Sequence, residues 1–342
     1  METTNQRKSE VIDAIRADPE TDRRRGYFDA VRLRHRALPE VDLARVDTGT
    51  RFLGKRVSFP LILSSMTGGD EDRLRLVNRH LAAAAEREGV AMGVGSQRVM
   101  FTHPAARDSF ALRPFAPSAP LMANLGAVQL NYGFDLGECL RAVEVLQADA
   151  LCLHLNPLQE AVQPEGNTNF EGLADRIGSI AERLPVPVVI KEVGAGLAPE
   201  DVALLAARGV RFFDIAGAGG TSWSRIEHHR QAARGGHHAG LAFQDWGLPT
   251  PEALRALRPW RGRATLIASG GIRSGIDMAK ALALGASMCG AAAPFLEAAL
   301  RSAEAVAAVI EDFRRAFRTA MFLAGAATVA DLEGHEERLW SA

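Results

Sequence analysis

The stretch Thr265–Pro294, TLIASGGIRSGIDMAKALALGASMCGAAAP, decides the fold that we expect for this chain. It opens on the apolar run Thr265–Ala268, typical of a buried parallel strand, and a glycine pair follows where backbone can approach a ligand closely. Ser274 begins a capping box that predicts a helix, and a second short strand and small-residue turn come after it. Because the loops after the last two strands of a (β/α)8 barrel commonly bind phosphate, these turns and Arg273 predict a phosphate site. Two tight turns without a ligand are the alternative.

Apolar segments of strand length recur at intervals of roughly 30 residues along the chain. Amphipathic helical segments separate them, among them Arg73–Arg87, Leu136–Gln147 and Pro199–Arg208. The alternation predicts a single (β/α)8 TIM barrel; a doubly wound sheet would place a glycine fingerprint after its first strand, where this sequence has none. The eight strand candidates are Leu61–Ser65, Val90–Gly93, Leu121–Asn124, Ala150–Leu155, Val186–Lys191, Phe212–Ile215, Thr265–Ala268 and Ser287–Cys289.

Two segments lie outside this repeat. Residues 1–60 form an N-terminal extension that we expect to pack on the barrel of residues 61–342 and to reach the substrate site. Residues 217–249 follow the sixth strand candidate as a loop too long for an ordinary connection, and we expect a functional lid or interface element there. This loop contains His228-His229 and His237-His238, whose spacing matches no standard zinc site.

Composition narrows the classes of function. The 342 residues, 47% of them hydrophobic, can bury a large core, and a formal net charge of −1 gives no basic field for nucleic acid. The locally basic run from Arg23 to Arg36 is interpreted as a solvated face. Cys139, Cys152 and Cys289 form no CxxC motif and suit buried thiols in a reducing compartment. Since the sequence shows neither a leader nor a membrane-length apolar run, we expect a cytoplasmic protein that binds neither nucleic acid nor membrane.

The carboxyl ends of the strand candidates carry small hydroxyl, amide and single charged side chains. Catalytic groups of barrels lie at these ends, and Ser, Thr and Asn suit hydrogen bonding to a polar heterocycle beside Lys191. Together with the phosphate turn they predict a mononucleotide cofactor such as FMN. His154 is either an acid–base residue or a hydrogen-bonded wall residue, and Gln159, which does not readily exchange a proton, would position substrate. Glu160 is either a ligand of Mg²⁺ or an ion-paired carboxylate at a helix start.

Two segments form the most specific signature, HLNPLQE at residues 154–160 and QPEGNTNF at 163–170, since glycine turns alone fit many flavin barrels. With them the chain resembles the type II, FMN-dependent isopentenyl-diphosphate isomerase family over nearly its whole length. The resemblance implies an isomerase that interconverts isopentenyl and dimethylallyl diphosphates, with reduced FMN, rather than a side chain, as the acid–base catalyst. The other matching stretches are Asn5–Lys8, Ser65–Gly69, Gly95–Arg98, Asn124–Gly126, Lys191–Gly194, Ala218–Trp223 and Ser269–Arg273.

The resemblance also implies roles for individual residues and for partners. Gln159 and His154 would form the catalytic set around the flavin, with Mg²⁺ on Glu160. NADPH would reduce the flavin, and the chain would form a homotetramer or homo-octamer. The substrate would contact Arg7, Lys8, Ser96, Gln97, Arg98 and Gln159. FMN would contact Ser65, Met66, Thr67, Ser96, Asn124, Lys191 and Thr221, with its phosphate on Gly271, Ile272, Arg273, Ala292 and Ala293.

One departure from the family concerns the N-terminal segment. Val11 stands where the family commonly has a histidine, which puts the rate or the substrate preference in question. An FMN-dependent 2-hydroxy-acid oxidase or dehydrogenase is the first alternative, but it would require a histidine in a glycine-rich element such as Gly217–Ser222, which has none. A non-catalytic flavin- or phosphate-binding protein is the second, and the filled set of substrate-side residues argues against it.

Overall fold

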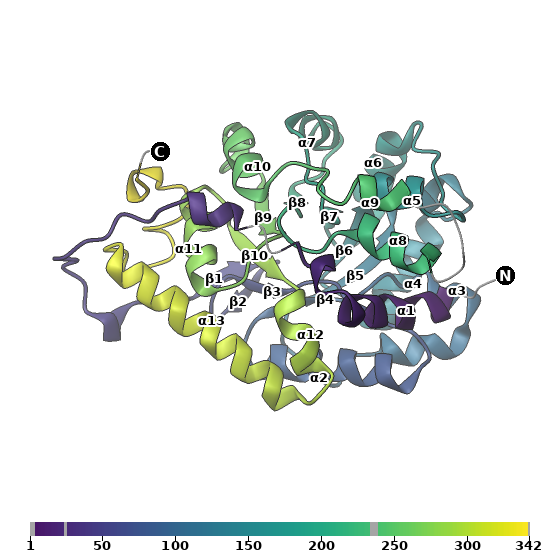
Figure 1. Cartoon of the computed structure of the whole chain (residues 1–342), viewed down its shortest axis with the longest axis horizontal. Coiled ribbons are helices and arrows are strands. Elements are labelled where there is room, and N and C mark those ends of the chain that lie inside the picture. The colour runs from purple at the N-terminus through teal and green to yellow at the C-terminus, as the bar shows by residue number, and fades with distance from the viewer. Residues whose placement is uncertain (1–3, 24–25, 233–238, 341–342) are drawn as a thin grey trace.

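The computed structural model describes residues 4–23, 26–232 and 239–340, with side chains from Lys8 onward (Figure 1). Eight parallel strands close into a barrel in the order β10-β3-β4-β5-β6-β7-β8-β9. Each strand overlaps one of the eight sequence candidates, so the prediction of a (β/α)8 barrel is confirmed. The strands are β3 (Leu61–Leu63), β4 (Ala91–Gly93), β5 (Leu121–Gly126), β6 (Ala150–Leu155), β7 (Val188–Glu192), β8 (Phe212–Asp214), β9 (Thr265–Ser269) and β10 (Met288–Ala291).

Helices surround the barrel (Figure 1). Seven of them carry the outer layer: α2 (Asp72–Glu88), α4 (Leu136–Leu146), α6 (Leu173–Arg183), α7 (Pro199–Ala206), α10 (Thr250–Ala256), α11 (Gly275–Ala283) and α13 (Ala303–Leu323). Shorter helices are α3 (Val99–Thr102), α5 (Pro157–Val162), α9 (Ala239–Ala242) and α12 (Ala293–Ala299). Within the described ranges, none of the helices combines the length and the apolar character needed to cross a membrane.

Helix boundaries follow from local chemistry. The side-chain oxygen of Ser274 accepts the N–H of Asp277 at the start of α11, as the capping motif predicts. The Asp277 carboxylate accepts the N–H of Arg273 and the hydroxyl of Ser274, so it braces the turn that precedes the helix. Gly285 follows α11 with φ of 102°, a conformation that glycine adopts without a steric penalty.

The hairpin of β1 (Thr50–Phe52) and β2 (Lys55–Val57) closes the N-terminal end of the barrel. Phe52 packs edge-on against Phe212, with the ring centroids 6.3 Å apart. The hairpin therefore fills this end with side chains and leaves the C-terminal end of the strands for a site. Phe52 and Val57 share one buried cluster with the barrel interior: Ile62, Ala91, Met122, Ala150, Cys152, Val189, Ile267 and Met288.

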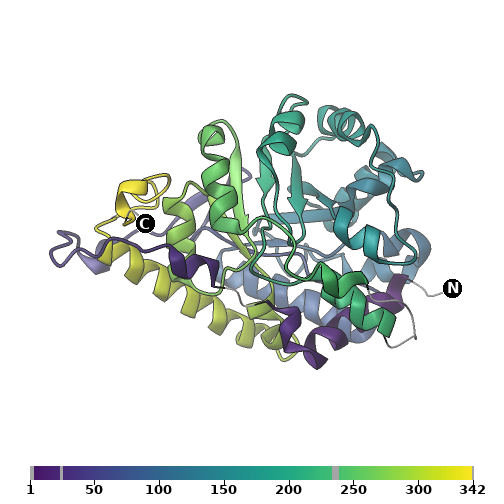
Figure 2. The ribbon, with the colours of Figure 1, turned by 45° about the horizontal axis from the view of Figure 1, so that its top comes forward.

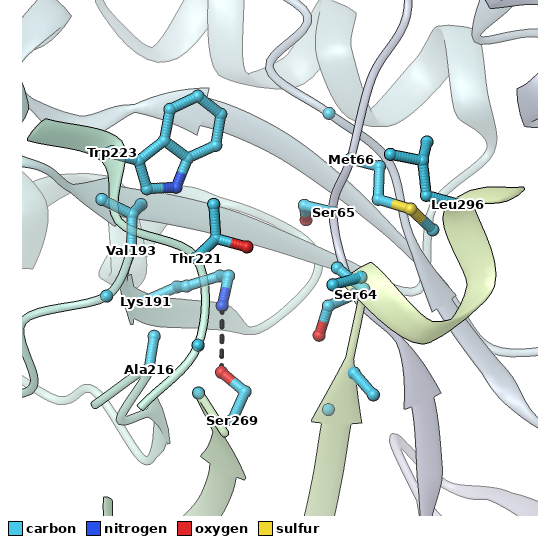
Figure 3. Close-up of a pocket in the computed structure, with 18 of the residues that line it drawn as sticks. Ser64, Ser65, Met66, Lys191, Val193, Ala216, Thr221, Trp223, Ser269 and Leu296 are labelled. Atoms are coloured by element: carbon cyan, nitrogen blue, oxygen red, sulfur yellow. Dashed lines mark hydrogen bonds between the residues drawn. The ribbon is translucent and has the colours of Figure 1, made fainter. Parts of the chain in front are cut away.

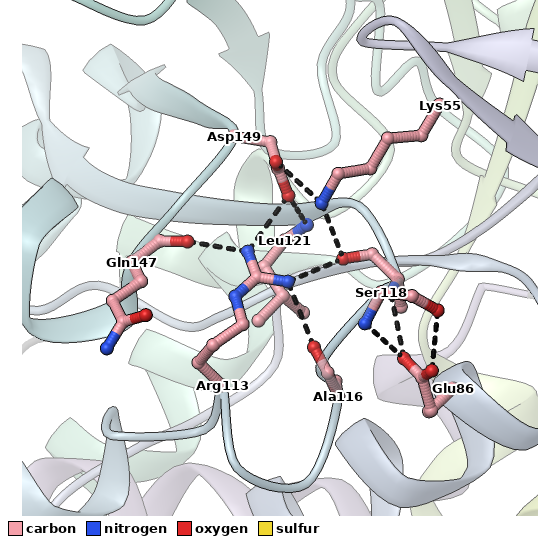
Figure 4. A network of polar contacts seen from close by, with 9 residues as sticks. Lys55, Glu86, Arg113, Ala116, Ser118, Leu121, Gln147 and Asp149 are labelled. Carbon is pink, nitrogen blue, oxygen red and sulfur yellow. Dashed lines mark hydrogen bonds and ion pairs between the residues drawn. The ribbon is translucent and has the colours of Figure 1, made fainter.

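A polar network fixes the same hairpin to the strand starts (Figure 4). Lys55 Nζ lies 2.7 Å from one oxygen of Asp149, and Arg113 Nη2 lies 3.0 Å from the other. The N–H of Leu121 also donates to Asp149 at 2.8 Å. Although burial raises the pKa of Asp149, the hydrogen bonds from Lys55, Leu121 and Arg113 hold it below its usual value. The Asp149 carboxylate is thus ionised and ties the β1–β2 hairpin to β5.

The opposite end of the barrel is covered by α1 (Thr4–Ala17) and α8 (Trp223–Ala232), which lie side by side in purple and green (Figures 1 and 2). Arg230 of α8 lies 3.3 Å from Glu10 of α1, and Arg225 lies 2.6 Å from Asp18, which follows α1. The segment at 217–249, expected as a long loop, contains helices α8 and α9, and α8 packs against α1.

Of the two histidine pairs in this region, the structure describes His228-His229. His229 Nε2 is hydrogen bonded to the carboxylate of Asp18. His237-His238 lies outside the described residues. Among the residues that the structure does describe, no three His, Cys, Asp or Glu side chains are grouped to hold a metal ion.

Candidate active site

A pocket opens at the carboxyl ends of the eight barrel strands, under α1 (Figure 3). Every strand end contributes to its lining. All the residues that the sequence predicted for the cofactor lie in this one pocket: Ser65, Met66, Thr67, Ser96, Asn124, Lys191, Thr221, Gly271, Ile272, Arg273, Ala292 and Ala293. Residues from distant parts of the chain are thus brought together as expected for a barrel site.

The glycine turn after β9 packs closely against the loop after β8. Gly270 and Gly271 have φ of 88° and 81°, which disfavours any other residue. A Cβ built on Gly270 would come 2.0 Å from the carbonyl oxygen of Gly217. The absence of side chains here therefore leaves backbone as the pocket wall, as a phosphate cradle requires.

Two buried hydroxyls on the β3 side face the pocket without a partner. Ser64 Oγ and Thr67 Oγ1 are both fully enclosed and find no hydrogen-bond partner in the described part of the chain. Because a buried hydroxyl without a partner costs free energy, these atoms point to a polar ligand that would satisfy them.

Lys191 stands at the end of β7 within a buried polar triad, of which Figure 3 shows Lys191 and Ser269. Its Nζ donates to Asp214 at 2.7 Å and to the hydroxyl of Ser269 at 3.2 Å. Ser269 in turn donates to the other oxygen of Asp214. The triad holds a cation at a fixed point on the pocket floor, where an electron-rich ring can be bound.

His154 is held neutral in a hydrogen-bonded chain. Its Nδ1 lies 2.8 Å from Asn124 Oδ1, and Asn124 Nδ2 donates to Ser65 Oγ at 2.9 Å. Burial lowers the pKa of His154 to about 4, and the positive charges of Lys8, Lys191 and Arg98 add to the effect. With Asn124 Oδ1 as the acceptor, a neutral ring would carry its proton on Nδ1, and this arrangement favours the wall role of His154 over the acid–base role.

The amide of Gln159 is oriented from both sides. Asn156 Nδ2 donates to Gln159 Oε1 at 3.0 Å, and Gln159 Nε2 donates to Glu227 Oε1 at 2.9 Å. Glu227 is 1% exposed and forms an ion pair with Arg230 on the next turn of α8. Gln159 lines the pocket with a defined donor and acceptor, which suits positioning of a substrate.

Glu160 does not face the pocket. Its carboxylate accepts hydrogen bonds from Asn156 at 3.0 Å, from Gln163 at 2.6 Å and from the N–H of Asn167 at 2.6 Å. The side chain is buried and closes the 156–167 segment on itself. As arranged here, Glu160 acts as an anchor for the segment that carries Gln159.

The residues expected to bind substrate divide into two groups. Lys8 and Ser96 line the pocket, and Lys8 Nζ donates to the carbonyl of Ser96 at 2.8 Å. Gln97 is fully buried outside it: its amide donates to Ala142 and accepts the N–H of Asn124, so the structure does not place it for ligand contact.

Two further substrate candidates are positively charged. Arg98 is not among the pocket-lining residues, but it is close enough to His154 to help lower the pKa of that ring. The side chain of Arg7 lies outside the described part of the structure.

An apolar wall covers the mouth of the pocket. Val11, Ile12 and Ile15 project from α1. Met66, Trp223 and Leu296 face the same space from the barrel (Figure 3). Val11, where the sequence resemblance led us to expect a histidine, thus adds apolar surface and no charge to the site.

The turn after β7 is shaped by a buried carboxylate. Glu192 Oε2 accepts the N–H groups of the next four residues, 193–196. Burial raises the pKa of Glu192 to about 7, against the lowering effect of these four hydrogen bonds. Arg23 donates to the carbonyls of Gly194 and Gly220, which joins this turn to the loop after β8.

Sequence reasoning missed several residues that shape the site. Asp214 ends its strand next to the apolar run of β8, and a charge at that register was a usable signal. Asp22 and Glu227 also line or brace the pocket. Both come from segments outside the strand–helix repeat, so no periodicity marked them.

These features define a class of protein: a (β/α)8 barrel with a pocket for a phosphorylated, ring-bearing ligand at the carboxyl ends of its strands. The family model described as FMN-dependent dehydrogenase matches residues 4–109 and 153–340. A flavocytochrome b2 mutant with pyruvate bound has a TM-score of 0.69 at 19% identity, over 97% of this chain and 82% of that one. A mandelate oxidase mutant has a TM-score of 0.62 at 20% identity, over 98% of both chains. At these identities the likeness shows the fold alone.

Curated relatives are far more similar in sequence. The isopentenyl-diphosphate delta-isomerase of Paracoccus zeaxanthinifaciens is 57% identical over 96% of this chain and 95% of the relative. That of Hydrogenovibrio crunogenus is 53% identical over 96% and 95%, and that of Nostoc is 46% identical over 90% and 87%. This chain belongs to the isopentenyl-diphosphate delta-isomerase family, on the barrel of the FMN-dependent dehydrogenases. The family resemblance stated from the sequence is confirmed.

Proposed function

We propose that this chain interconverts isopentenyl and dimethylallyl diphosphates with FMN bound in the pocket. The observation that carries the proposal is chemical: the pocket combines a phosphate cradle and a fixed cation with a neutral His154. An isolated alkene needs a proton donor, and neither the His154 ring nor the Gln159 amide offers an acidic proton at neutral pH. The relatives, at up to 57% identity, carry the isomerase name.

The residues present fit FMN. The glycine turn of Gly270 and Gly271 leaves bare backbone for the phosphate, and Ser64 and Thr67 have buried hydroxyls that need a partner. Lys191 would lie by the ring, held by Asp214. When bound and reduced, FMN would supply the proton donor and acceptor and an electron-rich ring face.

The chain's own side chains would bind, orient and shield. Lys8 and Arg98 would attract the diphosphate, since both carry positive charge near His154. Gln159 would hold the substrate with an amide fixed by Asn156 and Glu227. The apolar wall of Val11, Ile12, Ile15, Met66, Trp223 and Leu296 would exclude water from the reacting alkene, which protects a cationic species from capture.

An oxidase or dehydrogenase of 2-hydroxy acids is less well supported. Such a reaction needs a base to take the substrate's hydroxyl proton. His154 is the histidine that lines the described pocket, and a pKa of about 4 makes it a weak base. The glycine-rich loop at 217–222 has no histidine.

Mg²⁺ at Glu160 was expected from the family resemblance, but the residues around this carboxylate do not fit the ion as they are arranged. Three donors occupy the carboxylate, and it does not line the pocket. We therefore assign no step to the ion; its binding would require at least one of those hydrogen bonds to open. A Glu160→Gln variant whose activity keeps the wild-type dependence on Mg²⁺ would exclude Glu160 as its ligand.

The remaining expectations concern the reductant, the cellular location, the oligomeric state and the N-terminal extension. We propose NADPH as the reductant of FMN, a cytoplasmic location, and a homotetramer or homo-octamer. Residues 1–60 are proposed as an extension that serves the substrate site, which the position of Lys8 and Val11 in the pocket lining supports. Light scattering on the purified protein would give the oligomeric state.

An absorbance spectrum combined with a product assay tests the function. Purified protein reconstituted with FMN is expected to be yellow, to bleach with NADPH without oxygen, and then to convert isopentenyl diphosphate, followed by NMR. Reconstitution with a 5-deaza flavin is expected to abolish turnover, because N5 is then replaced by carbon. Retained turnover with that analogue would exclude the flavin as acid–base catalyst, and a protein that binds no flavin would overturn the proposal.

A further inference from the structure

The phosphate end of the pocket contains a carboxylate as well as a cation. Asp22 and Arg273 both line the pocket, beside the glycine turn. Arg273 Nη2 is hydrogen bonded to Asp22 Oδ1, and Nη1 donates to the carbonyl of Ile272 at 3.0 Å. The arginine proposed to bind the phosphate is therefore already paired with an anion.

Asp22 is held in this position by backbone pairing. It forms an antiparallel bridge with Thr221. On either side, the N–H of Arg23 donates to Gly220 at 3.1 Å and the N–H of Ser222 donates to Thr21 at 2.7 Å. The Asp22 side chain is 16% exposed. The carboxylate is thus a built feature of the pocket and does not swing freely into solvent.

The pairing of Arg273 is incomplete. Its Nε is buried and has no hydrogen-bond acceptor in the described part of the chain. A phosphate with several acceptor oxygens would complete the guanidinium, but its negative charge would approach that of Asp22. The phosphate and Asp22 would thus compete for the guanidinium of Arg273.

We propose that Asp22 is a determinant of cofactor affinity that weakens binding of the FMN phosphate by sharing Arg273. The inference rests on the proposed FMN site and adds to it a residue that acts against the cofactor. When FMN binds, Arg273 then moves its interaction from Asp22, in the segment that follows α1, to the phosphate. Binding of the cofactor and packing of that segment on the barrel are therefore linked.

The test compares two flavins on the protein freed of cofactor. Flavin fluorescence quenching gives the Kd of FMN and of riboflavin, which lacks the phosphate, for wild type and for Asp22→Asn. The variant keeps the shape and removes the charge. We expect roughly tenfold tighter FMN binding and an unchanged Kd for riboflavin, because only FMN carries the competing anion. Unchanged riboflavin binding also shows that the pocket is folded.

Asp13→Asn is the matched control. Asp13 also pairs with an arginine, Arg73, at 2.8 Å, but it is exposed and does not line the pocket, so the FMN Kd should not change. Unchanged or weaker FMN binding by Asp22→Asn overturns the inference, and so does an equal gain for riboflavin. FMN binding without isomerisation would instead overturn the proposed function and leave the inference standing. If no variant binds either flavin, both fail.

Discussion

Replacing His154 tests the claim that this ring is neutral in the folded protein at neutral pH. Burial and neighbouring positive charge lower its pKa from 6.5 to about 4. Between pH 4 and pH 6.5 the His154 ring is protonated in the unfolded chain but neutral in the folded chain. The free energy of unfolding therefore falls as the pH drops from 6.5 to 4, and this loss is absent above pH 6.5. At about 1.4 kcal/mol for each pKa unit, the lowering from 6.5 to about 4 gives a full penalty of up to about 3.5 kcal/mol. Because the ring borders the open pocket, this figure is an upper bound.

The assay is urea unfolding at pH 7 and at pH 5, for wild type and for His154→Gln. Glutamine can still donate to Asn124, and all other groups titrate alike in both proteins. We expect wild type to lose about 2 kcal/mol more than the variant on going from pH 7 to pH 5. An NMR titration of the imidazole nitrogens provides a second measurement. An equal loss in both proteins, or protonation of His154 with a midpoint near 6.5, would refute the reasoning and reopen His154 as an acid.

Three further substitutions probe other parts of the molecule. Gly270→Ala is expected to weaken FMN binding more than tenfold, because its Cβ would meet a backbone oxygen at 2.0 Å. Gly262→Ala is the control: Gly262 has a similar φ of 70° but open space around it, so this substitution should not affect FMN binding. Lys191→Met leaves Asp214 buried without its cation and should cost about 3 kcal/mol in chemical unfolding. Phe52→Ala should also cost about 3 kcal/mol, yet leave the flavin Kd unchanged, since it lies at the opposite end of the barrel.

The strands were predictable because their signal is local. Each contains a short apolar run that is mostly buried, as at β10, so its position follows from the residues themselves. The glycine turn after β9 was predictable for the same reason, since only glycine tolerates its φ values and close contacts. The residues expected to bind the cofactor came from the family resemblance, and barrel geometry explains why they line one pocket at the strand ends.

Side-chain direction was not predictable at the same level. Gln97 and Ser96 are neighbours, yet Ser96 lines the pocket while Gln97 is buried against α4 and β5. Glu160 likewise follows Gln159 but turns into its own loop. Both differences depend on which donors and acceptors the surrounding elements present, and these come from distant parts of the sequence.

The sequence by itself determined the barrel, the glycine turn after β9 and the family, because burial patterns, glycine conformations and motifs are properties of short segments. Tertiary structure decided the protonation and the charge pairing of the residues in the site. It made His154 neutral by enclosing it near three cations, and it set Asp22 against Arg273 across 251 positions of chain. Charge interactions depend on distance and on burial, and neither is defined until the chain has folded.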